Sequence, residues 1–262
     1  MDLEVISRQP TSPSHSAPLL FVHGAWHGAW CWAEHFLNYF AARGYAAHAL
    51  SLRGHGASPG RDHLRWTSIA DYVADVAQVA SQLPTLPVVI GHSMGGLAVQ
   101  KYLETHVARA AVLLASVPPA GALATTLRIA RRHPVAFAKA NMLLSLYPLV
   151  STPQLVRESF FSPSMPEGEL RRYFAQIQDE AYRAFLDMLA FNLPKPKRVN
   201  TPVLVIGAAN DTVFLSYEVE ATANAYKTQA VIFPNMAHDL MLDTGWQSVA
   251  DRIIVWLSEK GL

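Results

Sequence analysis

The sequence holds a single cysteine, Cys31, among its 262 residues. One thiol excludes an internal disulfide and a zinc site built from cysteines, so we expect Cys31 to be a small core residue. Charged side chains are also scarce, at 16%, and the formal net charge is +1. A chain with so little net charge lacks the basic field that nucleic-acid-binding proteins use. We therefore expect no nucleic-acid partner.

Long hydrophobic runs are missing as well. The most apolar long stretch, residues 136–150, is interrupted by Lys139, Asn141 and Pro148, whereas a helix that spans a bilayer needs about 20 apolar residues. Residues 1–8 lack the basic start and apolar block of a secretory signal. These patterns predict a cytoplasmic protein without a stable membrane anchor. The sequence leaves open whether the protein is a monomer or a homodimer.

Two motifs for bound groups are absent. The sequence contains no H-E-x-x-H pattern for zinc and no G-x-x-x-x-G-K-S/T loop for phosphate. We therefore expect no metal site and no cofactor.

Apolar residues, in contrast, make up 51% of the chain, enough for a large core. Short apolar runs alternate with segments whose apolar residues recur at helical spacing. The predicted strands are residues 3–7, 19–22, 45–52, 87–90, 110–115, 202–207 and 230–233, and the predicted helices are 31–43, 66–83, 97–106, 215–226 and 246–260. This alternation predicts an α/β fold with a mostly parallel, doubly wound sheet.

The alternation stops between residues 120 and 193, where we find no convincing strand. Short helices are expected there, beginning near Pro134, Pro153 and Pro166, because proline suits a first helical turn. Ser164 and Glu167 match the capping-box pattern. We therefore expect core residues 1–119 and 195–262, with a helical insertion at 120–194.

The most informative stretch surrounds Ser93. A buried strand ending at Ile90 runs into Gly91-His92-Ser93-Met94-Gly95, and a helix follows. Such a G-x-S-x-G turn holds its serine in strained backbone geometry, and the glycines leave room for the close approach of strand and helix. The pattern predicts an exposed, nucleophilic hydroxyl at Ser93.

A serine hydroxyl needs a base, and the base needs an orienting anion. Asp211 follows the strand at 202–207, and His238 follows the strand at 230–233. Because parallel strands end at the same edge of a sheet, we expect Ser93, Asp211 and His238 to meet there as nucleophile, orienting carboxylate and base. Rival carboxylates are Asp187, Asp239 and Asp243, and His92 is expected to pack beside the turn.

With these motifs the chain resembles the α/β-hydrolase-fold serine hydrolases, of the esterase and lipase type, over almost its whole length. The residues that carry the resemblance are His23-Gly24, Arg53-Gly54-His55-Gly56-x-Ser58, Gly91-x-Ser93-x-Gly95-Gly96, Asp211 and His238. The run from His23 to Trp32 also resembles the corresponding loop of plant methylesterases and hydroxynitrile lyases. The resemblance implies that the insertion is a helical cap over the site.

An acyl-transfer site must also stabilise a negative oxygen with backbone N–H groups. By position these N–H groups belong to Met94 and Ala25, with Trp26 as the second choice. Arg53 and His55 are expected to form a structural turn. The residues expected to line the substrate pocket are Trp26, His92, Phe137, Leu143, Phe161 and Met188.

These features predict a hydrolase of small carboxylic esters with an apolar acyl or alkyl group. Two alternatives stay open from the sequence. One is another reaction on the same three residues, such as carbon–carbon bond hydrolysis, lactone opening, thioester hydrolysis or cyanohydrin cleavage. The other is a non-catalytic ligand-binding protein. Serine in place of aspartate at position 93 argues against the dehalogenases and epoxide hydrolases of the superfamily.

Overall fold

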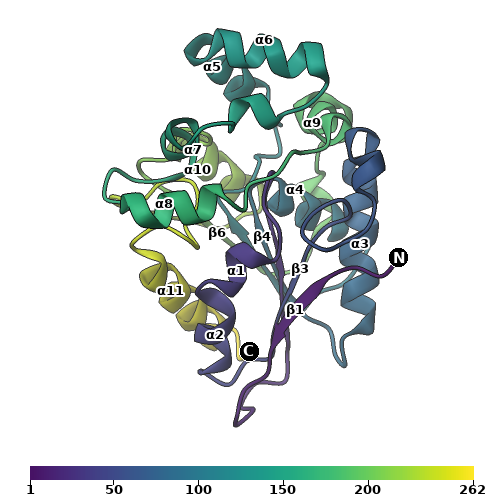
Figure 1. Cartoon of the computed structure of the whole chain (residues 1–262). Coiled ribbons are helices and arrows are strands. Elements are labelled where there is room, and N and C mark those ends of the chain that lie inside the picture. Colours follow the sequence, from purple (N-terminus) through teal and green to yellow (C-terminus); the bar gives the residue numbers. More distant parts are fainter.

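A seven-stranded sheet forms the centre of the molecule in the computed structural model, which describes residues 1–262 (Figure 1). The strands are β1 (Val5–Arg8), β2 (Leu19–Val22), β3 (Ala47–Leu50), β4 (Val88–His92), β5 (Ala110–Leu114), β6 (Val203–Ala208) and β7 (Ala230–Phe233). Their order is β1-β3-β2-β4-β5-β6-β7, and only β1 pairs antiparallel. The predicted α/β fold with a mostly parallel sheet is confirmed.

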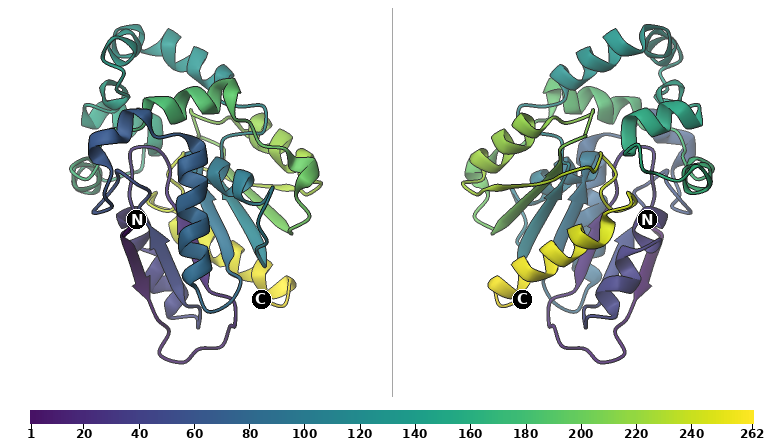
Figure 2. Two further views of the ribbon diagram at one scale, coloured as in Figure 1. Left: turned by 90° about the vertical axis from the view of Figure 1, so that its right-hand side faces the viewer. Right: turned by 90° about the vertical axis from the view of Figure 1, so that its left-hand side faces the viewer.

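Helices cover both faces of this sheet, as Figure 2 shows. The core helices are α1 (Trp30–Ala33), α2 (Phe36–Ala41), α3 (Ile69–Gln82), α4 (Ser93–Tyr102), α10 (Ser216–Ala225) and α11 (Trp246–Glu259). Side chains alternate along β4, so Val88 and Ile90 belong to the apolar cluster that includes α2 and α11, whereas Val89 belongs to the cluster that includes α3, α4 and α10. The doubly wound arrangement therefore follows from strands that are apolar on both faces.

The segment between β5 and β6 contains helices and no strand. These helices are α5 (Leu123–Arg132), α6 (Pro134–Leu143), α7 (Pro153–Phe160), α8 (Glu167–Phe174) and α9 (Tyr182–Leu186), and the short helical turns of the segment are η2 (Tyr147–Leu149), η3 (Asp187–Phe191) and η4 (Pro196–Arg198). Another short turn, η1 (Arg61–Trp66), precedes α3 and lies outside this segment. In Figure 1 α5 and α6 lie at the top of the molecule. Hydrogen bonds tie the segment to loops that follow β2, β3 and β7. It therefore lies over the edge where the parallel strands end.

Local sequence signals explain where most of these helices begin. Helices α6 and α7 begin at the predicted prolines, Pro134 and Pro153. Ser68 forms a capping box with Asp71 at the start of α3. The capping box predicted at Ser164 is wrong, because Pro166 is the residue before α8 and the Ser164 hydroxyl bonds to Ser162 and Thr244 instead.

Two helices depart most from the predicted bounds, while α3, α10 and α11 lie within the predicted ranges. The helix expected over residues 31–43 is divided into α1 and α2, since His35 between them has a non-helical backbone with φ −133°. Gly44 then takes a left-handed φ of 88°, as expected for a residue that ends a helix. Helix α4 begins at Ser93, four residues before the predicted start, because the strand turns directly into the helix. No helix of the chain is both long and apolar enough to cross a bilayer.

Candidate active site

The turn between β4 and α4 places Ser93 at its apex. Ser93 has φ 51°, in the left-handed region that side chains other than glycine rarely adopt. A Cβ on Gly95 would lie 2.3 Å from the carbonyl oxygen of His23, and one on Gly91 would lie 2.5 Å from that of Gly95. Glycine is therefore required at both positions so that the strained serine can sit between a strand and a helix in close contact.

The structure brings Asp211 and His238 to this serine. His238 Nε2 lies 3.0 Å from Ser93 Oγ, and His238 Nδ1 lies 2.8 Å from Asp211 Oδ2. Asp211 follows β6, His238 follows β7, and Ser93 follows β4. The three side chains thus form one hydrogen-bonded chain at the edge of the sheet where these strands end, in the geometry by which a histidine accepts a hydroxyl proton.

The carboxylate of Asp211 is fixed from its other side. The backbone N–H groups of Val213 and Phe214 donate to Asp211 Oδ1 over 2.7 and 3.0 Å. The rival carboxylates have different partners: Asp239 lies 3.0 Å from His27 Nε2, Asp243 accepts from Ser162 and Ala237, and Asp187 accepts from Ile69 and Arg183. Among these four carboxylates, only Asp211 touches the imidazole of His238.

Two free backbone N–H groups lie at the positions expected for an oxyanion hole. Those of Ala25 and Met94 donate to no other group of the protein. The backbone N–H of Trp26, the second choice, instead donates to Glu180 Oε2 over 3.2 Å. Trp26 is therefore occupied, which leaves Ala25 and Met94 as the available donors.

His92 lies behind His238 and not on a pocket wall. It is buried, and its Nε2–H donates to the carbonyl oxygen of His238 over 3.1 Å. Burial, and next the nearby imidazole of His238, lower the pKa of His92 to about 3. His92 is thus neutral at ordinary pH and helps to hold the backbone of His238, in agreement with the packing role expected from the sequence.

A buried pair next to His92 escaped the sequence analysis. His27 and Asp239 are almost fully buried and lie 3.0 Å apart. Burial alone would lower the pKa of His27, but the charge and hydrogen bond of Asp239 outweigh it and raise that pKa. Burial would likewise raise the pKa of Asp239, yet His27 holds it below its ordinary value. The directions of these shifts make the pair ionic between the ordinary pKa values of Asp239 and His27, 3.8 and 6.5. Only its adjacency to His238 in sequence could have indicated it.

Arg53 and His55 form a structural turn, as expected. Arg53 Nη2 lies 2.7 Å from Asp75 and Arg53 Nη1 lies 2.9 Å from Asp71, so the turn is tied to α3. His55 is buried and its Nε2 lies 3.0 Å from Glu180 of the inserted segment. Glu180 is a second buried residue that the sequence analysis missed, because its partners lie more than 100 residues away.

A metal ion fits this site poorly. Ligand atoms of His92, His238 and Asp239 lie within 4.8 Å of one another. However, both ring nitrogens of His238 are already bonded to Ser93 and Asp211, and Asp239 Oδ2 is bonded to His27. A cation would therefore have to break the hydrogen-bonded chain from Ser93 through His238 to Asp211.

A pocket of about 240 Å³ opens beside the site, between α5, α7 and the loop after β6. Its lining residues are mostly apolar and include Trp26, Ile129, Leu149, Val150, Phe160, Val213 and Leu215. The Phe160 ring stacks near the imidazole of His238, with centroids 6.0 Å apart. Phe160 therefore lies between this pocket and His238, while Ser93, Asp211 and His238 are not among the lining residues.

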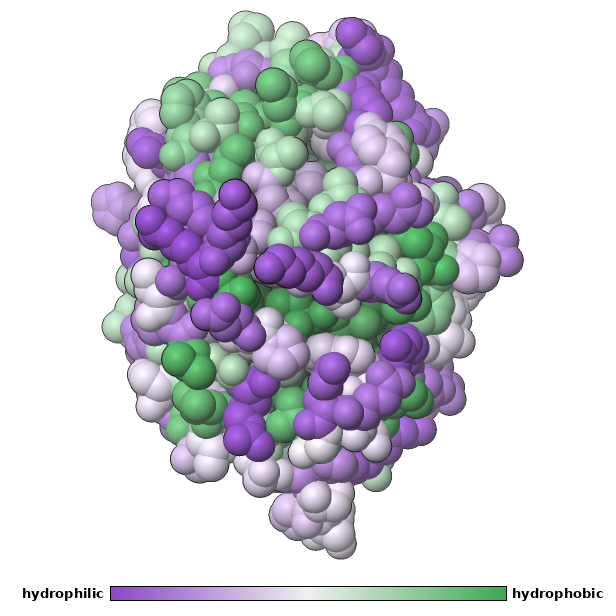
Figure 3. Space-filling view, turned by 180° about the vertical axis from the view of Figure 1, so that it is seen from behind, coloured by the Kyte–Doolittle hydropathy of each residue, from purple (hydrophilic) through white to green (hydrophobic).

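Of the six residues predicted to line the pocket, only Trp26 does so. Leu143 is 58% exposed at the end of α6, and Phe137 is half-buried on the same helix. Figure 3 shows apolar surface gathered at this upper end of the molecule. Phe161 stacks on Tyr173, Met188 is buried in the apolar cluster to which residues of α3 and α4 also belong, and His92 donates to the backbone of His238. Helical apolar spacing did not indicate which side chains face the cavity.

Known proteins share both the sequence pattern and the fold. A monoacylglycerol lipase from Mycolicibacterium smegmatis is 25% identical over 242 residues, covering 86% of this chain and 82% of the relative. An esterase from Oryza sativa is 34% identical over 119 residues, covering 42% of each chain, so this chain matches less than half the length of that relative. A solved bromoperoxidase from Bacillus anthracis has a TM-score of 0.74 at 18% identity, covers 98% of this chain and 96% of its own, and shares the fold alone.

The family comparison covers nearly the whole chain. The model of the alpha/beta hydrolase family matches residues 19–252, from β2 to the middle of α11. This range includes the Ser93 turn and the loops that carry Asp211 and His238. The chain therefore belongs to the alpha/beta hydrolase family.

Proposed function

We propose that this protein is a serine hydrolase that cleaves carboxylic esters through an acyl-serine intermediate. The observation that carries the proposal is the hydrogen-bonded chain from Ser93 through His238 to Asp211, with distances of 3.0 and 2.8 Å. Similarity to a monoacylglycerol lipase and to a plant esterase supports an ester as substrate.

In the proposed reaction His238 Nε2 takes the proton of Ser93 while Oγ attacks the ester carbonyl carbon. Asp211 holds the imidazole and stabilises its positive charge. The negative carbonyl oxygen of the tetrahedral intermediate accepts hydrogen bonds from the N–H groups of Ala25 and Met94. The intermediate collapses as the alcohol leaves with the proton from His238, and an acyl-serine remains. Water, deprotonated by the same histidine, then releases the carboxylic acid.

We assign residues 120–194 the role of a cap over this reaction. Helices α5 and α7 supply much of the pocket that Trp26 and Phe160 line. A mostly apolar wall favours an apolar acyl or alkyl group over a sugar or nucleotide. The proposed substrate is therefore a small carboxylic ester whose acyl or alkyl group is apolar and binds between the helical insertion and the sheet.

The test compares the wild type with Ser93→Ala. A fluorophosphonate probe is expected to label the wild type once per chain and to fail on the variant. The wild type is also expected to hydrolyse p-nitrophenyl esters, with kcat reduced by about 10³-fold or more in the variant. Matched circular dichroism spectra control for folding. Labelling without ester turnover would redirect the proposal to another reaction of the same serine, and no labelling would contradict it.

A further inference from the structure

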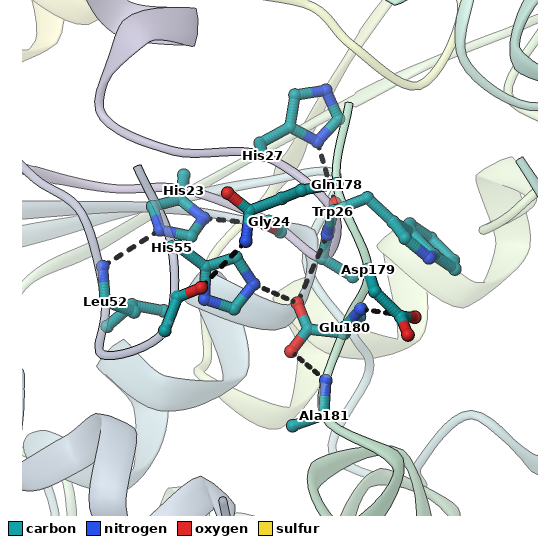
Figure 4. A network of polar contacts seen from close by, with 12 residues as sticks. His23, Gly24, Trp26, His27, Leu52, His55, Gln178, Asp179, Glu180 and Ala181 are labelled. Atoms are coloured by element: carbon teal, nitrogen blue, oxygen red, sulfur yellow. Dashed lines mark hydrogen bonds and ion pairs between the residues drawn. The ribbon is translucent and has the colours of Figure 1, made fainter. Parts of the chain in front are cut away.

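The buried carboxylate of Glu180 has no part in the reaction proposed above, although it lies next to the site. Glu180 belongs to the inserted segment, just before α9, and is 1% exposed. Figure 4 shows its carboxylate among groups that come from several parts of the fold. Oε2 lies 3.2 Å from the Trp26 N–H nitrogen and 3.0 Å from His55 Nε2, while Oε1 accepts from Tyr72 Oη and the Ala181 N–H, both over 2.6 Å.

This carboxylate remains an acceptor at neutral pH. Burial alone would raise the pKa of Glu180, but the imidazole of His55 and the hydroxyl of Tyr72 outweigh it and hold that pKa below its ordinary value. An ionised carboxylate has no proton to donate, and each of its oxygens can accept more than one hydrogen bond. Glu180 can therefore hold the Trp26 N–H and its other donors together.

Trp26 needs such support because its backbone is strained. Its φ is 67°, in the left-handed region, which costs a residue with a Cβ roughly 1–2 kcal/mol. The residue is held on both of its backbone polar groups: the N–H by Glu180 and the carbonyl oxygen by the backbone N–H of Gln178, over 3.1 Å. Residues 178–180 thus clamp the loop that carries the proposed oxyanion donor Ala25.

The clamp is itself anchored to the core. The Gln178 side chain donates to the carbonyl oxygen of Gly54 over 2.9 Å and accepts from the N–H of Gly56 over 3.0 Å. Asp179 accepts from the backbone N–H groups of Leu146 and Tyr147, within the insertion. Residues 178–180 are therefore fixed to the turn after β3 and to the rest of the insertion, so they can hold Trp26 in its strained backbone conformation.

We propose that Glu180 is a positioning residue, which holds the Trp26 N–H so that the neighbouring N–H of Ala25 is the one that faces the oxyanion. This inference rests on the proposed function. Without the carboxylate, Trp26 can leave the left-handed region and turn the peptide groups on either side of it. A misplacement of a reacting group by about 1 Å can lower the rate by up to ~10²-fold. Loss of the Glu180 carboxylate is therefore expected to lower kcat and to leave substrate binding little changed.

Two conservative variants separate positioning from charge. In Glu180→Gln the amide oxygen can still accept from Trp26 when the NH₂ group donates to Tyr72 Oη, although the Ala181 N–H then loses its acceptor and the negative charge beside His55 is lost. In Glu180→Asp the charge remains, but the side chain is one methylene shorter and retracts from Trp26. Positioning predicts that the Gln variant keeps kcat within about 3-fold of wild type while the Asp variant loses about 10-fold or more, with KM little changed in both. A charge role predicts the reverse order.

Tyr72→Phe is the matched control, because it removes a bond to Oε1 of the same carboxylate and leaves the bond to Trp26 intact. It should lower the melting temperature without lowering kcat. All values of kcat, measured with p-nitrophenyl butyrate, are divided by the sites that a fluorophosphonate labels at completion, so that misfolded chains are not counted.

The outcomes separate this inference from the function on which it rests. A wild type that neither labels nor hydrolyses esters contradicts the proposed function. If the wild type labels and hydrolyses esters, two results would show that Glu180 is only structural. One is a kcat of Glu180→Asp within 2-fold of wild type. The other is a kcat per labelled site that is as low in Tyr72→Phe as in Glu180→Asp. A larger loss in the Gln than in the Asp variant would also overturn the inference.

Discussion

Replacement of Asp211 by asparagine should abolish most activity even though the two side chains have almost the same shape. The reason is the direction that the structure imposes on the new amide. In the wild type, Oδ1 accepts from the backbone N–H groups of Val213 and Phe214, and Oδ2 faces His238 Nδ1. An amide has one oxygen and one NH₂ group, so it can satisfy only one of these two sides as an acceptor.

The free-energy cost of unpaired hydrogen-bond donors decides which way the asparagine amide oxygen points. Pointing the NH₂ group at the backbone N–H donors of half-buried Val213 and buried Phe214 would leave both unpaired, at a cost of up to about 1–3 kcal/mol each. The amide oxygen therefore stays with Val213 and Phe214, and the NH₂ group donates to His238 Nδ1. The proton of the imidazole must then sit on Nε2, which donates to Ser93 and no longer accepts its proton. This wrong tautomer is expected to lower kcat by about 10⁴-fold.

The assay is steady-state hydrolysis of a p-nitrophenyl ester, with chemical unfolding of the same samples. Asp211→Ala serves as the control, since it leaves both backbone N–H groups unpaired and has no amide to direct the imidazole. Asp211→Asn should be the more stable of the two variants and no more active. An Asn variant that keeps kcat within about 10-fold of wild type would refute the tautomer argument.

Two further predictions concern the buried ion pair and the pocket. His27 has a raised pKa and stabilises the fold below its ordinary pKa of 6.5, and Asp239 has a lowered pKa and stabilises it above its ordinary pKa of 3.8. Asp239→Asn should therefore lower the free energy of unfolding most, by about 3–5 kcal/mol, between pH 3.8 and 6.5, and by less at pH 9. A loss that is the same at every pH, measured by urea unfolding, would contradict this. Ile129→Trp should fill part of the pocket of about 240 Å³ and lower kcat/KM for p-nitrophenyl octanoate about 10-fold more than for p-nitrophenyl acetate. The control Leu143→Ser, at an exposed position, should leave kcat/KM for both esters unchanged. Equal losses on the two esters in Ile129→Trp would show that the acyl group binds elsewhere.

The parts of the fold that the sequence could predict are those set by local pattern. Strands β2 and β7 have the predicted bounds, because each is a short apolar run between turn residues. Ser93, Asp211 and His238 could be brought together because parallel strands end at one edge of the sheet. The predicted α4 began late because the pattern did not reveal that the strand turns into the helix within one residue.

The parts that could not be predicted depend on contacts between distant residues. Nothing near Glu180 in sequence indicates that its carboxylate meets Trp26, His55 and Tyr72. Likewise, Phe161 and Leu143 are both apolar residues of the insertion, yet Phe161 is 6% exposed and Leu143 is 58% exposed. Helical spacing shows that a face is apolar, but the arrangement of the helices decides whether that face meets the core, the pocket or the solvent.

The position of β7 has a consequence for how activity is lost. β7 is one of the two edge strands of the sheet, is half-buried along its length and pairs only with β6, whereas β4 is fully buried between two neighbours. Local opening should begin at such weakly covered elements. His238, the proposed base after β7, would then separate from Ser93, the proposed nucleophile after β4, while the centre of the sheet stays folded. Under mild heat or denaturant, enzymatic inactivation would thus precede the cooperative melting of the domain.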